Sequence, residues 1–196
     1  MRIAATLLAL SVAGTIAHAQ GGAAPPANPM ATAFRNRTTA LRRQIAQALD
    51  SIPESKYGYK PTPAQLTVGY VAQHMSSDDY FFCGNFSDKK PTVSDEESNT
   101  ADSVKAAWPK AKLMANLRAA VAYCDDAMSQ LDDTNLGAII TVAGPNNTTR
   151  QVSRMNYLLG HAIDLADHYS QLANYMRLNQ MLPPTALPRP GGRGGR

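Results

Sequence analysis

Three side chains that could bind a metal ion share one face of the predicted last helix. Placed at about 100° per residue, His161, Asp164 and His168 fall within about 60° of arc. Their neighbours on that side are mostly leucine and tyrosine, which predicts that this polar stripe points into the protein, whereas Asp167 points to solvent. An imidazole or carboxylate buried without a partner costs several kcal/mol, and a divalent metal ion is one partner that removes this cost.

The spacing separates stronger from weaker ligand candidates. Asp164 and His168 are four residues apart, the spacing at which one helix supplies two ligands to one ion. His161 lies two turns before His168, roughly 10 Å by the helical rise, so it is the weaker candidate. His74, on the apolar face of the second predicted helix, is the expected third ligand. Asp78, one turn later, could orient the His74 imidazole.

A His–Asp–His set with open coordination positions suits a catalytic Zn²⁺, Ni²⁺, Mn²⁺ or Fe²⁺ ion, with His161 or Asp78 as a nearby acid or base. The same residues could instead form a structural hydrogen-bond network, because a histidine on an apolar face is commonly a hydrogen-bonded core residue. Spacing alone leaves these alternatives open. The sequence contains no nucleophile elbow, phosphate-binding glycine loop or CxxC pair that would indicate other chemistry.

Four predicted helices position these residues. Apolar periodicity and the placement of prolines predict helices over residues 29–51, 63–83, 109–132 and 149–179. Asn28 is the expected N-cap of the first helix, and Thr62 with Pro63 is the expected start of the second. The β-branched run 139–142 predicts a brief extended segment or a loop, and no sheet is expected. The expected fold class is therefore all-α, a four-helix bundle.

The composition permits one domain and argues against a nucleic-acid partner. The 196 residues have a formal net charge of +4. One of these charges, Arg2, lies near the N-terminus, and three more, Arg189, Arg193 and Arg196, lie in the Gly- and Pro-rich C-terminal segment. The remainder is neutral, so no basic face is expected. The C-terminal segment resembles an RNA-binding RGG sequence, but such chain ends are usually disordered, and we expect disorder here.

The first residues have the pattern of a secretory signal peptide. A basic residue precedes an apolar run over 3–16, and Ala17-His18-Ala19 is typical of a cleavage site. We therefore expect a secreted or periplasmic protein without a membrane span. The expected organisation is a signal peptide over 1–19, a flexible leader over 20–32, the helical bundle over 33–184 and a disordered tail over 185–196.

Export also bears on the two cysteines, Cys83 and Cys124. Disulfides persist in oxidising compartments, so two cysteines in an exported chain predict one bridge if their helices are neighbours. The functional alternative is a reactive thiol, which would need a cation beside it in a cleft.

The sequence resembles the DinB (DinB/YfiT-like) family over roughly residues 33–184. In the first half the resemblance rests on Ile52-Pro53, the stretch 57–63 (YGYKPTP) and His74, and in the second half on 167–172 (DHYSQL), 175–179 (YMRLN) and Pro183-Pro184. The ending of the second helix, 80–83 (YFFC), is similar to exported members. This resemblance implies a bundle with up-down-down-up order and a divalent metal held by three histidines.

His74 and His168 match the first and third of those histidines, and Asp164 stands at the middle position. A carboxylate can replace an imidazole as a ligand, but the same change is expected of a decayed site. Some relatives are thiol-dependent transferases or hydrolases. The expected function is therefore a metal-dependent hydrolase or transferase acting on a small molecule, with a homodimer as the expected assembly. The alternative is a non-catalytic bundle that binds a small ligand or partner.

Overall fold

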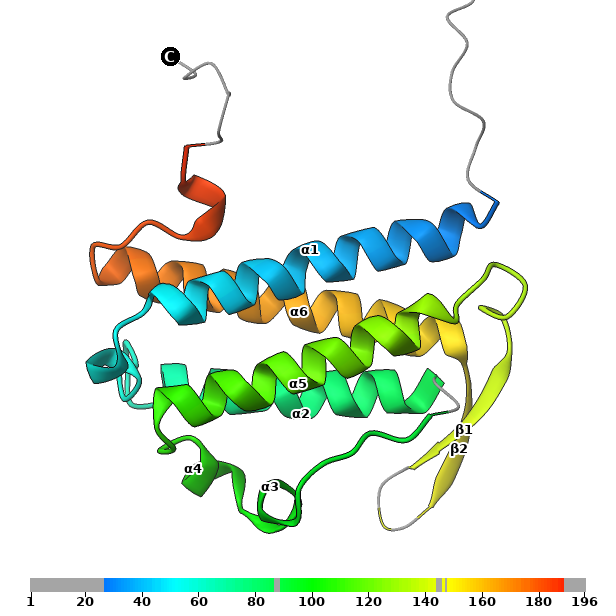
Figure 1. Ribbon diagram of the computed structural model, residues 1–196, viewed down its shortest axis with the longest axis horizontal. Helices are drawn as coiled ribbons and strands as arrows, with labels where there is room; N and C mark the ends of the chain where they lie inside the picture. The colour runs from blue at the N-terminus through cyan, green and yellow to red at the C-terminus, as the bar shows by residue number, and fades with distance from the viewer. Residues whose placement is uncertain (1–26, 87–88, 144–145, 147, 189–196) are drawn as a thin grey trace, which may run out of the picture.

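Four long helices form a bundle. The computed structural model describes residues 27–86, 89–143, 146 and 148–188, so the expected signal peptide and the tail beyond 188 lie outside the described residues. The bundle helices are α1 (Pro29–Ser51), α2 (Val68–Phe86), α5 (Lys110–Ser129) and α6 (Arg154–Leu178) (Figure 1). The short elements are η1 (Glu54–Lys56), α3 (Asp95–Asn99), α4 (Asp102–Lys105), β1 (Ile139–Ala143), β2 (Thr149–Ser153) and η3 (Pro184–Ala186).

The helices follow up-down-down-up order. In Figure 1, α1 and α6 run from right to left, whereas α2 and α5 run from left to right. α2 packs against α5 and α6, and α1 packs against the same two helices. α2 and α6 are therefore antiparallel neighbours, which brings the middle of one beside the middle of the other. Within the described residues, no helix combines the length and apolar composition needed to cross a membrane.

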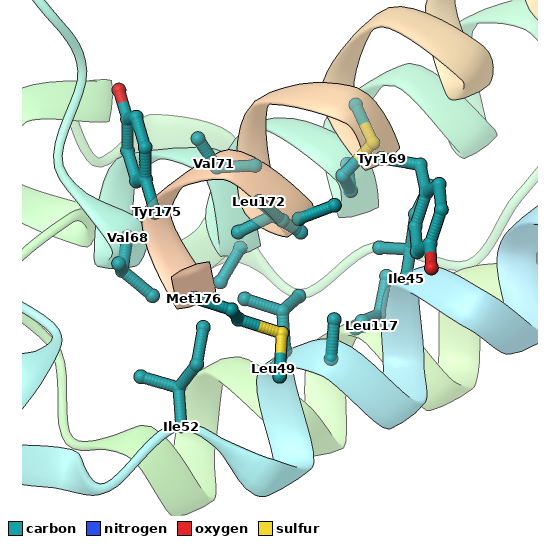
Figure 2. Close-up of a cluster of buried hydrophobic side chains, with 14 of the residues drawn as sticks. Ile45, Leu49, Ile52, Val68, Val71, Leu117, Tyr169, Leu172, Tyr175 and Met176 are labelled. Atoms are coloured by element: carbon teal, nitrogen blue, oxygen red, sulfur yellow. The ribbon is translucent and has the colours of Figure 1, made fainter. Parts of the chain in front are cut away.

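Apolar side chains from all four helices fill the bundle. Figure 2 shows Ile45 and Leu49 of α1 meeting Leu172 and Met176 of α6 and Leu117 of α5. These side chains are at most 2% exposed. A second buried cluster lies near the hairpin end and includes Phe86, Met128, Leu131 and Leu158. Burial of this kind supplies most of the stability that holds the four helices in register.

The first helix begins where Pro29 predicts, within the segment 20–32 that was expected to be a flexible leader. The cap differs from the prediction, because the Asn28 side chain makes no capping hydrogen bond. Asp133 replaces it: its carboxylate accepts hydrogen bonds from the backbone N–H groups of Met30 and Ala31, at 3.2 and 2.8 Å. A carboxylate at a helix N-terminus also interacts favourably with the helix dipole. Residues 29–32 are therefore helical and not part of a flexible leader.

The second helix begins later than predicted. It starts at Val68, and the Thr67 hydroxyl accepts a hydrogen bond of 3.1 Å from the backbone N–H of Tyr70. The expected start at Thr62 and Pro63 lies instead in a turn. Long-range contacts explain the difference, because the Leu66 carbonyl accepts a hydrogen bond from the Tyr175 hydroxyl of α6. That contact holds the preceding segment outside the helix.

The expectation of no sheet and of a last helix starting at residue 149 is wrong. Residues 149–153 form strand β2, which pairs antiparallel with β1, with Ile140 opposite Val152. Both of those side chains pack on the second core cluster. The β-branched run thus finds a partner strand that periodicity within a single segment could not indicate. Ser153 then caps α6 by accepting a hydrogen bond from the Asn156 N–H.

A disulfide joins two neighbouring bundle helices. Cys83 near the end of α2 pairs with Cys124 of α5, with the Cα atoms 5.3 Å apart. Both residues are fully buried. The Arg42 guanidinium of α1 packs beside Cys124, with Nη1 3.7 Å from its Sγ, and forms an ion pair with Asp125.

Candidate metal centre

Two antiparallel helices bring four ligand-type side chains to one point. His74 and Asp78 lie one turn apart on α2, and Asp164 and His168 lie one turn apart on α6. Each of the four offers one ligand atom, and these atoms all lie within 4.8 Å of one another. The structure thus brings together the three expected ligands. Asp78, which was expected to orient His74, lies in the same group.

The Nε2 atoms of both imidazoles face carboxylates in this cluster. His74 Nε2 lies 3.1 Å from Asp78 Oδ2, and His168 Nε2 lies 3.4 Å from Asp164 Oδ1. The two imidazole rings approach edge to face, with centroids 4.8 Å apart. The side chains of His74 and Asp164 are 30% and 23% exposed, so one side of the cluster is open to solvent.

The two carboxyl groups cannot both ionise easily without a cation. Burial and the negative charge of Asp164 raise the pKa of Asp78 to about 8. Burial would raise the pKa of Asp164 as well, but hydrogen bonds from His168 and Asp78 lower it. A proton on Asp78 is therefore shared with Asp164 at neutral pH. A bound cation would take over the role of that proton.

The two imidazoles also differ in protonation. Burial lowers the pKa of His74, and the nearby His168 lowers it further. Burial is the largest single influence on His168 and acts in the same direction, but the hydrogen bonds with Asp164 and Gln171 and the nearby negative charges together outweigh it and raise the pKa. A neutral imidazole is the form that binds metals, so His74 is already in the ligand state near neutral pH.

Hydrogen bonds behind His168 hold its ring in place. Its Nδ1 lies 3.2 Å from Gln171 Oε1, and the Gln171 amide donates a hydrogen bond of 2.8 Å to the Tyr175 hydroxyl. That hydroxyl donates in turn to the Leu66 carbonyl. Because Gln171 Oε1 accepts from Nδ1–H, the nitrogen that points into the cluster is Nε2, which would become a metal ligand once an ion displaces the proton that it shares with Asp164. Partners of this kind orient metal-binding histidines.

The donor set fits a divalent transition metal. Opposite ligands on an ion with bonds of about 2.1 Å are about 4.2 Å apart, so a cluster within 4.8 Å needs only small movements. Asp164 Oδ2 is buried and has no hydrogen-bond donor among the described residues when both carboxyl groups are ionised. Two imidazoles and two carboxylates suit Zn²⁺, Mn²⁺, Ni²⁺ or Fe²⁺.

His161 does not belong to this group, which differs from its expected role as an acid or base near the metal. It is fully buried, and its Nε2 lies 2.8 Å from Asp79 Oδ1. The Phe82 ring stacks on its imidazole, with centroids 5.3 Å apart. Sequence reasoning missed Asp79. Its position one turn before Cys83, on the side of α2 that meets other helices, is the signal that could have indicated a buried partner.

Comparison with known proteins supports the fold. The profile of the DinB superfamily matches residues 37–172. A DinB-like protein from Bacillus cereus ATCC 10987 superposes with a TM-score of 0.59 at 16% identity, over 78% of this chain and 95% of that one. A conserved protein from Enterococcus faecalis has a TM-score of 0.54 at 16% identity, over 75% and 95% of the two chains.

A mycothiol-dependent maleylpyruvate isomerase is also similar in fold. Its TM-score is 0.56 at 15% identity, over 72% of this chain and 60% of the isomerase. A search among curated proteins finds no match.

Proposed function

This chain belongs to the DinB superfamily, and we propose that it is an exported metal-dependent enzyme, a hydrolase or transferase acting on a small molecule. The observation that supports this most is the convergence of His74, Asp78, Asp164 and His168 on one point with an open side. An ion bound there would supply Lewis acidity to polarise a substrate or activate a water molecule.

The protein's own residues would hold the ion and move protons. His74, Asp164 and His168 are the proposed ligands, and the hydrogen bond from His168 to Gln171 keeps the ligand nitrogen pointed at the cluster. Asp78 is the proposed acid or base, because its carboxyl group lies in the same cluster as the three proposed ligands and would be beside a molecule bound to the ion. Helix α2 and helix α6 exclude water from one side of the cluster, and substrate would approach from the half-exposed side.

The mycothiol-dependent maleylpyruvate isomerase of similar fold suggests a thiol cosubstrate by analogy. The exported location that we propose argues against a cytoplasmic thiol in this role. The N-terminal pattern ending in Ala17-His18-Ala19 supports export. Hydrolysis needs only water as second reactant, so it agrees best with an exported enzyme.

The test is metal content of the mature protein after incubation with each ion and removal of excess. We expect about one ion per chain in the wild type and a loss of most of it in His168→Ala and Asp164→Asn. Asp167→Asn is the matched control, because Asp167 is exposed on the same helix, one residue before His168. Negligible metal in the wild type would remove the enzymatic proposal.

One observation favours a second candidate, a non-catalytic bundle. Each imidazole in the cluster already faces a carboxylate, so the four residues could satisfy one another without an ion. This alternative predicts that a chelator leaves the melting temperature unchanged. The metal-binding proposal predicts that a chelator lowers the melting temperature of the metal-loaded protein, because an ion bound to the native state stabilises it.

A further inference from the structure

A small aromatic pocket lies beside the candidate metal centre. It has a volume of about 190 Å³ and lies where the end of α2, the start of α6 and strand β2 meet. Figure 1 shows these three segments together at the hairpin end of the bundle. The lining residues are Phe81, Phe82, Arg150, Asn156, Tyr157 and Gly160.

The walls of the pocket are aromatic and held in place. Phe82 contacts Phe81 and Tyr157 with edge-to-face rings, at centroid distances of 5.3 and 6.1 Å. Behind Phe82, the buried His161 imidazole stacks on its ring. Phe81 is nevertheless 50% exposed, which leaves apolar surface at the mouth of the pocket. A rigid aromatic wall with an exposed edge suits a flat apolar group.

Gly160 allows the close approach of the Phe82 ring to α6. A Cβ atom added at this position would lie 3.1 Å from Phe82 Cε1, closer than ordinary contact. A larger side chain would therefore push the Phe82 ring away from α6. The absence of a side chain at this position lets Phe82 pack against α6 as one wall of the pocket.

Arg150 supplies the charge of the pocket, and the other five lining residues are uncharged. It lies on β2 with its side chain exposed. A guanidinium at the edge of an aromatic cavity is complementary to a carboxylate attached to a flat apolar body.

The pocket and the metal centre are one helical turn apart on both helices. Phe82 follows Asp78 by four residues, and Gly160 precedes Asp164 by four residues, which is about 6 Å of helical rise in each case. This spacing is comparable to the length of a small aromatic molecule.

We infer that this pocket is the substrate-recognition site of the proposed enzyme and that the substrate is a flat apolar carboxylate, such as an aromatic acid. Its reacting group would lie at the metal centre, its apolar body against Phe82 and Tyr157, and its carboxylate at Arg150. This inference rests on the proposed function, because it assigns the reacting group to the metal centre.

The test measures the affinity of three hydroxamates for the mature chain loaded with Zn²⁺ or with the ion that binds best. Hydroxamates bind metals, and the three probes are acetohydroxamate, benzohydroxamate and 4-carboxybenzohydroxamate. We expect the ring to improve affinity by about tenfold or more through apolar burial. We expect the carboxylate to add about threefold to fivefold, since the interaction with an exposed arginine is modest and screened by salt.

Two variants separate these contributions. Arg150→Gln should abolish the gain from the carboxylate and keep the gain from the ring. Gly160→Val, which displaces the Phe82 wall, should abolish both gains. Arg118→Gln is the matched control, because Arg118 is an exposed arginine of α5 that does not line the pocket.

Equal affinity for the three probes in a metal-loaded wild type would overturn the inference and leave the metal-dependent function standing. The inference would also be overturned, with the metal-dependent function left standing, if Arg150→Gln kept the full gain in affinity from the carboxylate. Arg150 is exposed, so this substitution need not disturb folding. Absence of both bound metal and hydroxamate binding would instead remove the proposed function together with this inference.

Discussion

Asp78 and Asp164 show how the proximity of two carboxyl groups changes their protonation. They face each other across the junction of α2 and α6, and burial together with the negative charge of Asp164 raises the pKa of Asp78 to about 8. The pair therefore resembles a dyad that shares one proton. A divalent ion is the natural replacement for that proton.

This leads to a prediction on pH. Metal binding should release at least one proton per chain near pH 7, from Asp78 and from the protonated fraction of His168, and progressively less above about pH 8, because Asp78 is by then ionised in the metal-free protein. Metal affinity should rise correspondingly as the pH increases towards that pKa. Calorimetry in buffers of different ionisation enthalpy measures the proton release. Affinity that stays constant between about pH 6.5 and 8.5 would contradict the shared-proton description.

The second residue-scale prediction concerns His161. Because it is fully buried against Asp79, His161→Ala should lower the free energy of unfolding by roughly 3 kcal/mol by leaving a buried carboxylate unpaired. Metal content should stay at its wild-type value in the folded protein. His74→Ala should do the reverse, with loss of metal and a smaller loss of stability, since His74 is partly exposed. Denaturant unfolding and elemental analysis check both predictions. Loss of metal in His161→Ala would refute the claim that His161 is separate from the metal centre.

Among the secondary-structure elements, the antiparallel helices α2 and α6 supply all four residues of the site. His74 and Asp78 could be placed on one helix face from the sequence, and so could Asp164 and His168, because the helical period is regular. The bounds of the helices were less predictable. The start of α2 depends on the contact from Tyr175 to Leu66, and strand β2 depends on pairing with β1, and both are long-range interactions.

Gly69 tests the packing of α2. A Cβ atom added there would lie 2.2 Å from the Ala106 carbonyl oxygen, a backbone atom that cannot move away independently. We expect Gly69→Ala to destabilise the protein by about 1–3 kcal/mol through overpacking. Gly58→Ala is the matched control, because nothing lies within 4 Å of the added atom. Denaturant midpoints measure both, and equal midpoints would show that α2 does not approach Ala106 so closely.

At the scale of the whole molecule, the disulfide links α2 to α5 near the hairpin end. The bonded residues are 41 positions apart. In the chain-entropy description, opening a loop of that length removes about 4 kcal/mol of stability. We therefore expect the double variant Cys83→Ala, Cys124→Ala to unfold at lower denaturant concentration while keeping its metal. An unchanged midpoint would indicate that the bridge does not form in the folded protein.

The overall architecture was more predictable from the sequence than the chemistry. Four apolar helical stripes predicted a four-helix bundle, and the DinB resemblance implied its up-down-down-up order. The partner of His161 was not predictable, because Asp79 is adjacent in sequence to Asp78 and only the three-dimensional arrangement sends the two carboxylates to different histidines. Helical periodicity thus indicated which residues share a face of one helix, but not which histidine each carboxylate pairs with.

The most direct measurement is a crystal structure of the metal-loaded protein with data collected at the absorption edge of the ion. We predict one strong anomalous peak within about 2.5 Å of His74 Nε2, His168 Nε2 and an Asp164 oxygen. A peak elsewhere, or none at this cluster in a protein shown to contain the ion, would contradict the proposed metal centre.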